Sequence, residues 1–227
     1  MSSFTSSCTS SDKRIGQNNK IPYTYLALGD SYTIGESVSE SERWPVQLVS
    51  ALNKKGIKVE EPRIIAKTGW RTDDMLNAAK SELDSTQQFE MVSLLIGVNN
   101  EYQGWAPEEF EPEFEACLDF AISKCKNGVK GVFVVSIPDY GYTPFGKKKQ
   151  KQISERLKIY NSICKKVSKE KGVTFYNITP ISQSNPDDIT LVAKDGLHPS
   201  GKQYGMWVDS FIDSLYKQLS SITSSSQ

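Results

Sequence analysis

The sequence has no excess of charge of either sign: 27 lysine and arginine residues balance 27 aspartate and glutamate residues, so the formal net charge is zero. Proteins that bind nucleic acid through its phosphates need a basic surface, and this composition gives no sign of one. The chain also contains no apolar run of the length that a membrane-spanning helix requires. The sequence therefore argues against a nucleic-acid-binding protein and against an integral membrane segment.

Histidine and cysteine are also scarce, with one histidine and four cysteines in 227 residues. No Cys-x-x-Cys or Cys/His zinc pattern occurs, and the glycine-rich loops that hold phosphates or dinucleotides are absent. We therefore expect neither a metal nor a cofactor. Three cysteines fall on the apolar stripes of predicted helices, which predicts small buried hydrophobic residues and no disulfide framework: Cys117, Cys125 and Cys164.

The first 20 residues are rich in serine and threonine and lack the apolar segment of a secretory signal. We expect a flexible leader (1–20), a single domain (21–219) and a disordered tail (220–227). Cys8 leaves two interpretations open. As the sequence stands, it is a free cysteine and the protein is expected in the cytoplasm. If the true start lies upstream, Cys8 resembles the lipid-anchoring cysteine of a cell-envelope lipoprotein.

Short apolar runs alternate with stretches of helical periodicity along the chain. Strand–helix alternation of this kind is typical of a parallel sheet with helices on both faces, where sites form at the carboxyl ends of the strands. The predicted strands are Thr24–Leu28, Arg63–Ala66, Met91–Ile96, Gly131–Ser136 and Val173–Asn177. The predicted helices include Trp44–Leu52, Thr72–Leu83, Phe110–Cys125, Ile153–Val167 and Tyr204–Leu219.

A serine and a histidine stand where nucleophilic catalysis would need them. Ser31 comes two residues after Gly29, at the end of the first predicted strand, and His198 lies three residues after Asp195 in "DGLHPS". A carboxylate bonded to one imidazole nitrogen fixes the tautomer and leaves the other nitrogen free to take a proton from a serine. Taken singly, each motif is equally typical of an ordinary turn or surface loop.

Two further polar signals follow predicted strands, Gly69 after the second and Asn99 after the third. Acyl transfer requires hydrogen-bond donors for the oxyanion that develops on the substrate. The backbone N–H groups of Ser31 and Gly69 and the amide of Asn99 supply such donors. Because parallel strands end at one edge of their sheet, these residues and His198 are expected to converge on one rim.

The order of these four segments resembles that of the SGNH hydrolases, also called GDSL lipases or esterases. The matching blocks are "GDSY" (Gly29–Tyr32), Gly69, "GVNN" (Gly97–Asn100) and "DGLHP" (Asp195–Pro199), and they span nearly the whole domain. The resemblance implies a flavodoxin-like three-layer α/β/α sandwich with a five-stranded parallel sheet. The sequence departs from the family pattern at one position, where Asn100 replaces the usual aspartate. This change is expected to affect only the residues that support Asn99.

The same resemblance implies the roles of the site residues. Ser31 would be the nucleophile, His198 the general base and Asp195 its orienting acid, with an oxyanion hole made by the Ser31 and Gly69 amides and the Asn99 side chain. The aromatic residues of nearby loops are expected to contact the substrate: Tyr102, Trp105 and Tyr140.

The function predicted in this way is hydrolysis of small carboxylic esters through an acyl-enzyme, by a GDSL-type lipase/acylhydrolase or esterase. A carbohydrate acetyl esterase, a lysophospholipase and a thioesterase are alternatives within the family. A non-catalytic, flavodoxin-like binding module is the alternative from another class. An α/β-hydrolase is excluded, because the serine is not in a Gly-x-Ser-x-Gly elbow.

Overall fold

The computed structural model describes residues 22–184 and 187–224 of the chain. The leader expected at 1–20, with Cys8, lies outside the described residues. Five parallel strands form one sheet in the order β2-β1-β3-β4-β5. Their bounds agree with the predicted strands to within one or two residues: β1 Tyr25–Gly29, β2 Arg63–Ala66, β3 Met91–Leu95, β4 Val132–Val135 and β5 Thr174–Tyr176.

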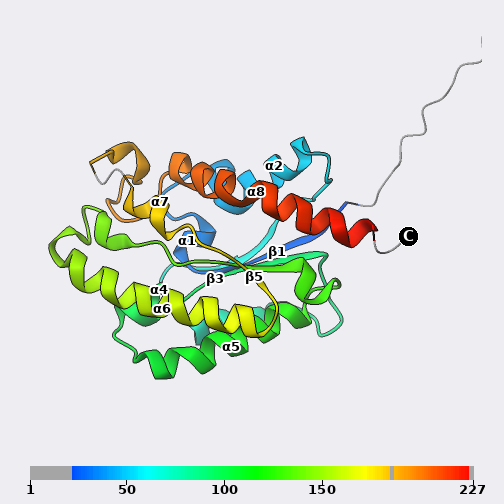
Figure 1. Cartoon of the computed structure of the whole chain (residues 1–227), viewed down its shortest axis with the longest axis horizontal. Coiled ribbons are helices and arrows are strands. Elements are labelled where there is room, and N and C mark those ends of the chain that lie inside the picture. Colours follow the sequence, from blue (N-terminus) through cyan, green and yellow to red (C-terminus); the bar gives the residue numbers. More distant parts are fainter. Residues whose placement is uncertain (1–21, 185–186, 225–227) are drawn as a thin grey trace, which may run out of the picture.

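Helices cover both faces of this sheet and make a three-layer α/β/α sandwich (Figure 1), as expected. On one face α2 (Trp44–Lys54) packs against α8 (Gly201–Ser224), and on the other α5 (Pro107–Ser123) packs between α3 (Thr72–Glu82) and α6 (Gln150–Glu170). The short helices are α1 (Ser31–Ile34), α4 (Val98–Tyr102), α7 (Thr179–Gln183) and the 3-10 turns η1 (Glu40–Glu42), η2 (Gly128–Gly131), η3 (Tyr140–Tyr142), η4 (Lys147–Lys149) and η5 (Ile189–Leu191).

The register of the sheet brings the ends of three strands level. Gly29, the last residue of β1, pairs with Ala66 of β2 on one side and with Leu95 of β3 on the other. β2 lies on one side of β1, and β3, β4 and β5 follow on the other side. The point between β1 and β3 is therefore the topological switch point, where ligand sites form in open α/β sheets. The helices α1 and α4 follow these two strands, at the left-hand end of the sheet in Figure 1.

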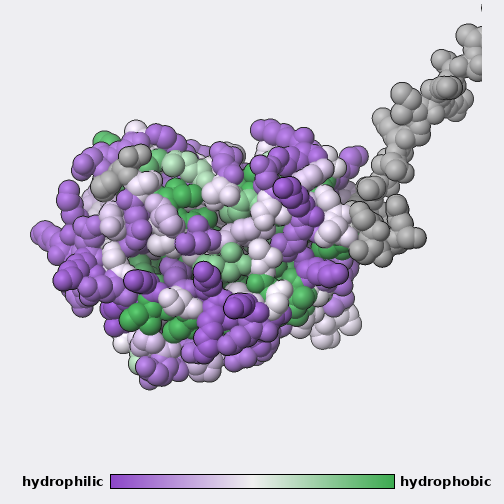
Figure 2. Space-filling model, in the orientation of Figure 1, coloured by the Kyte–Doolittle hydropathy of each residue, from purple (hydrophilic) through white to green (hydrophobic). Residues whose placement is uncertain are grey.

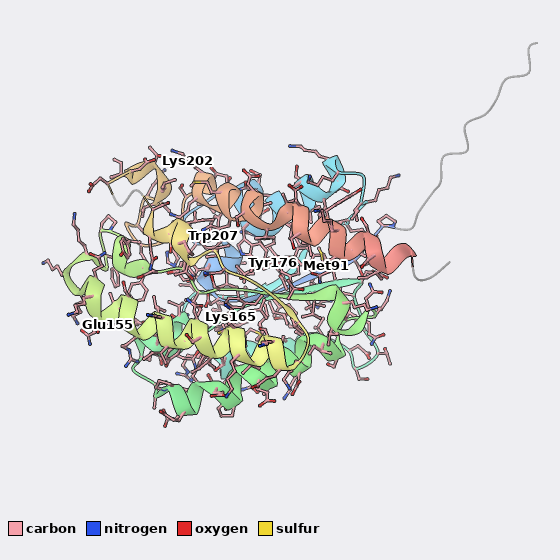
Figure 3. The ribbon with its side chains drawn as sticks, in the orientation of Figure 1. Met91, Glu155, Lys165, Tyr176, Lys202 and Trp207 are labelled. Carbon is pink, nitrogen blue, oxygen red and sulfur yellow. The ribbon has the colours of Figure 1, made fainter. Side chains whose placement is uncertain are left out.

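Aromatic side chains fill the layers between sheet and helices. Trp207 of α8 is fully buried, and Figure 3 shows it between α8 and the sheet layer, which also carries Tyr176. The Tyr176 ring stacks on Phe211 of α8 at 4.7 Å between centroids. On the opposite face Phe110 of α5 stacks on Tyr160 of α6 at 4.4 Å. Burial of these rings on both faces contributes to the hydrophobic driving force that holds the helices to the sheet.

Cys117, Cys125 and Cys164 are buried and free, as the sequence predicts. One boundary differs from the prediction. The tail was expected from Ser220, but α8 continues to Ser224, because Leu219 is fully buried and Ile222 packs against the core. None of the helices in the described part of the chain combines the length and apolar character needed to cross a bilayer.

The outer surface is mixed in polarity. On the face shown in Figure 2, hydrophilic side chains cover most of the area, and hydrophobic ones appear as several small separate patches. Isolated apolar patches of this kind are ordinary for a folded protein.

The Phe110–Tyr160 stack gives a direct test of the packing between α5 and α6. Phe110→Ala should lower the free energy of unfolding by roughly 3 to 5 kcal/mol, because a fully buried ring is replaced by a cavity. Ile159→Ala is the control, since that side chain is 49% exposed and should change stability by less than about 0.5 kcal/mol. Urea unfolding measures both values, and equal effects of the two substitutions would contradict this packing.

Candidate active site

Ser31 is placed by a tight turn at the end of β1. A β-carbon on Gly29 would collide with Oγ1 of Thr33 and with the last carbonyl oxygen of β3, so only glycine fits there. The Asp30 side chain then caps α1 by accepting a hydrogen bond of 3.0 Å from the Tyr32 N–H. Ser31 is therefore the first residue of α1, just beyond the sheet edge, and is 5% exposed.

His198 is held by Asp195 from the same short loop. The Nδ1 atom of His198 lies 2.6 Å from Oδ2 of Asp195, and Oδ1 of Asp195 accepts the backbone N–H groups of Leu197 (2.9 Å) and His198 (3.0 Å). Partial burial acts to raise the pKa of Asp195, but these hydrogen bonds, that of His198 first, outweigh it and lower the pKa to about 2. An ionised Asp195 requires the proton of a neutral His198 to sit on Nδ1, which leaves Nε2 as an acceptor.

Ser37 is a partner of Asp195 that the sequence did not reveal. Its Oγ donates a hydrogen bond of 2.8 Å to Oδ2 of Asp195. Among the described residues, Ser37 is the only non-glycine residue with positive φ, at 65°, a conformation that is uncommon for serine. The bond ties the loop that follows Ser31 to the loop of His198.

Aromatic rings also pack near the His198 imidazole. The ring of Tyr32, buried behind Ser31, meets the His198 ring edge to face with 5.5 Å between centroids. Tyr32 in turn packs against Trp207 of α8 at 6.4 Å. The position of His198 therefore depends on α1 and α8 as well as on its own loop.

Gly69 and Asn99 lie at the same rim as Ser31. Gly69 has φ of 85°, which favours glycine, and the space where a β-carbon would project is open to 4 Å. The N–H groups of Ser31 and Gly69 donate to no other described residue. The Asn99 Nδ2 donates one hydrogen bond of 2.8 Å to the Trp70 carbonyl, which leaves its second N–H available. The N–H groups of Ser31 and Gly69 and one N–H of the Asn99 amide therefore have no acceptor among the described residues.

Asn100 supports this arrangement from inside the fold. It is fully buried; its Oδ1 accepts the Thr72 N–H at 3.1 Å and its Nδ2 donates to the Thr72 Oγ1 at 2.8 Å. These bonds tie α4 to the start of α3, next to the Gly69–Trp70 loop. An asparagine satisfies both groups of Thr72 without a buried charge. The departure at position 100 therefore leaves the neighbouring Asn99 supported.

The structure brings the predicted residues together in one cleft of about 200 Å³, whose walls include Ser31, Gly69, Asn99 and His198. Asp195 stands behind His198. The Ser31 hydroxyl makes no hydrogen bond with any described residue. In hydrolases without bound substrate, the hydrogen bond between a catalytic serine and its base is often long or poorly aligned.

Of the three aromatic residues expected to contact the substrate, two line the cleft and one does not. Tyr102 and Tyr140 line the cleft, whereas Trp105 does not. The chain turns at Gly104, with φ of 82°, and the Trp105 ring lies on the guanidinium of Arg71 at 5.3 Å. The walls instead include residues that were not predicted as site residues: Tyr32, Thr68, Val98, Phe145 and Leu197.

A flavodoxin-like sandwich with serine, glycine, asparagine and histidine at one rim defines the class of SGNH hydrolases. The family model of the GDSL-like Lipase/Acylhydrolase family matches residues 27–206, and the chain belongs to this family. No curated protein sequence matches the chain.

Solved structures share the fold at low sequence identity. A G-D-S-L family lipolytic protein from Veillonella parvula has a TM-score of 0.66 at 13% identity, with 84% of this chain and 96% of that chain covered. The psychrotrophic esterase EstA from Pseudoalteromonas sp. gives 0.65 at 17%, with coverage of 87% and 99%. Est24, a carbohydrate acetylesterase from Sinorhizobium meliloti, gives 0.62 at 17%, with coverage of 86% and 99%.

The carboxyl group of Asp30, the residue before Ser31, lies in an environment that disfavours its ionised form. The residue is fully buried and its Oδ2 has no hydrogen-bond partner among the described residues. Burial raises the pKa of the Asp30 carboxyl to about 7, although the hydrogen bond from Tyr32 opposes the rise. The neutral carboxyl is therefore the form that the fold favours.

This shift predicts a pH dependence of stability with a definite sign. Between the ordinary pKa of 3.8 and about 7, the folded protein holds a proton on Asp30 that the unfolded chain has lost. The free energy of unfolding should therefore fall as pH rises through this window, by at most about 1.4 kcal/mol per pH unit from this group. Asp30→Asn mimics the neutral carboxyl and should flatten the decline.

Urea unfolding from pH 4 to 8 measures this slope for the wild type and the variant. Asp209→Asn, which removes an exposed carboxylate of α8, is the control and should keep the wild-type slope. An Asp30→Asn protein with the wild-type slope would show that Asp30 is ionised throughout this range.

Proposed function

We propose that the protein is a serine ester hydrolase, which cleaves small carboxylic esters through an acyl-enzyme. The observation that carries this proposal is the 2.6 Å contact between His198 Nδ1 and Asp195 Oδ2, in a cleft that also contains Ser31. An imidazole fixed in this tautomer presents Nε2 as a base, and Ser31 is the nucleophile within the same cleft.

In the first step, Ser31 Oγ attacks the ester carbonyl carbon while its proton passes to His198 Nε2. The carbonyl oxygen becomes an oxyanion, which the Ser31 and Gly69 N–H groups and the Asn99 amide are free to bind. Asp195, whose pKa is about 2, stays ionised and stabilises the imidazolium without taking its proton.

In the second step, the imidazolium gives its proton to the leaving alcohol, and the acyl group remains on Ser31 as an ester. A water molecule then attacks this ester, with His198 Nε2 taking the water's proton. Collapse of the second tetrahedral intermediate returns the proton to Ser31 and releases the carboxylic acid. One base thus serves both halves of the reaction.

The size of the cleft favours a short acyl group. Its volume of about 200 Å³ is smaller than the roughly 300–1,000 Å³ of sites for drug-sized ligands. Its apolar wall includes Val98, Phe145 and Leu197. Deacetylation of carbohydrates is a second candidate, since an acetyl group suits this small cleft and Est24, which shares the fold, is a carbohydrate acetylesterase.

Covalent labelling tests the assignment of Ser31. EstA, which has the same fold, has been solved in a form inhibited by monoethylphosphonate. A fluorophosphonate probe should modify this protein once, at Ser31, because the reagent phosphonylates serines activated by a neighbouring base. Peptide mass spectrometry locates the adduct.

Three variants complete the labelling experiment. Ser31→Ala should lose both the label and p-nitrophenyl butyrate hydrolysis, and His198→Ala should label far more slowly. Ser41→Ala, which changes an exposed serine of η1, should label at the wild-type rate. A Ser31→Ala protein that keeps wild-type esterase activity would refute the assignment, and a folded wild type that hydrolyses no ester would favour the non-catalytic binding module.

A further inference from the structure

A second cleft adjoins the cleft of Ser31. It has a volume of about 400 Å³ and shares three residues with the first: Tyr102, Tyr140 and Phe145. Beyond these rings, its walls continue to the start of α6, at the left-hand end of the molecule in Figure 1. The three shared residues therefore form a common wall of the two clefts.

The three shared rings form an aromatic ridge between the clefts. Their centroids are 6.2 to 6.3 Å apart in each pair. Tyr140 is fixed, because its hydroxyl donates a hydrogen bond of 2.8 Å to the buried carboxylate of Glu101. Tyr102 and Phe145 are 61% and 53% exposed, which is high for such large apolar side chains. The ridge offers ring faces over which the middle of a substrate can pass.

The far wall of the second cleft is positively charged. Arg156 pairs with Glu101 at 2.9 Å, so these two charges offset each other. Lys148 and Lys149, both exposed in η4, line the cleft, and their ammonium groups form no ion pair or hydrogen bond with any described residue.

We propose that the second cleft is a subsite for an anionic group of the ester substrate, held by Lys148 and Lys149. The group is a carboxylate, phosphate or sulfate, carried several bonds away from the ester carbonyl across the aromatic ridge. This proposal rests on the hydrolase function proposed for Ser31. It adds a substrate class, because a neutral ester of the same size gains nothing from the two ammonium groups.

Matched substrates separate the charge of the substrate from its size. Mono-p-nitrophenyl glutarate carries a carboxylate on the acyl side, and p-nitrophenyl valerate is its neutral counterpart. For the alcohol side, 4-sulfophenyl butyrate is compared with 4-acetylphenyl butyrate. The measured quantity is the ratio of kcat/KM for the anionic ester to kcat/KM for the neutral one, in each pair.

Two double variants provide the matched comparison. Lys148→Ala/Lys149→Ala removes the charges that line the cleft, and Lys147→Ala/Lys151→Ala removes the same charge from the same run but outside its walls. All four lysines are exposed, so both proteins should fold normally.

The first variant should lower the anionic-to-neutral ratio by about 2- to 30-fold in one substrate pair, as expected for two exposed ion pairs. The pair affected tells whether the acyl or the alcohol side occupies the subsite. The control variant should keep the wild-type ratio and hydrolyse the neutral esters normally, and 0.5 M NaCl should reduce the wild-type preference.

Equal losses in both double variants would assign the effect to the general field of the lysine run and overturn the subsite. An unchanged ratio in both substrate pairs would overturn it as well. Failure of the proposed hydrolase function has a different signature: neither neutral nor anionic esters would be hydrolysed by the wild-type protein.

Discussion

The site depends on one carboxylate. Four hydrogen-bond donors converge on Asp195: the His198 ring, the His198 and Leu197 backbone N–H groups, and the Ser37 hydroxyl. The first three fix the loop before α8, and the fourth attaches it to the segment that follows Ser31. With its pKa lowered to about 2, Asp195 is ionised at neutral pH and remains an acceptor. Asp195 therefore links the loop of His198 to the segment that follows Ser31.

The register of the sheet positions the other site residues, Ser31, Gly69 and Asn99. Because Gly29 is in register with Ala66 and Leu95, the segments after β1, β2 and β3 leave the sheet together. Asn99 and Asn100 then connect the segment after β3 to the segment after β2 through Trp70 and Thr72. The donors proposed for the oxyanion thus come from three segments that the strand register and two side-chain amides hold at fixed positions, which is the preorganisation that electrostatic catalysis requires.

The sequence predicts the parts of this molecule that depend on local pattern. The five strands were predictable because each is a short apolar run, and Gly29, Gly69 and Asn99 because each follows a strand end. The contact of Ser37 with Asp195 was not predictable, since it joins residues 158 positions apart and no periodicity marks it. Trp105 was misplaced because a positive-φ turn at Gly104 redirects the chain. The end of α8 was missed because the packing of Ile222 against the core outweighs the serine-rich composition around it.

The presence of a single histidine makes the central claim directly measurable. In protein labelled with ¹⁵N-histidine, the nitrogen shifts of the neutral ring report which nitrogen carries the proton. The Asp195–His198 contact predicts the Nδ1–H tautomer with a strongly downfield Nδ1 proton, and Asp195→Ala should abolish the downfield signal. A neutral ring protonated on Nε2 in the wild type would contradict the account, because Nε2 would then be unable to accept the proton of Ser31.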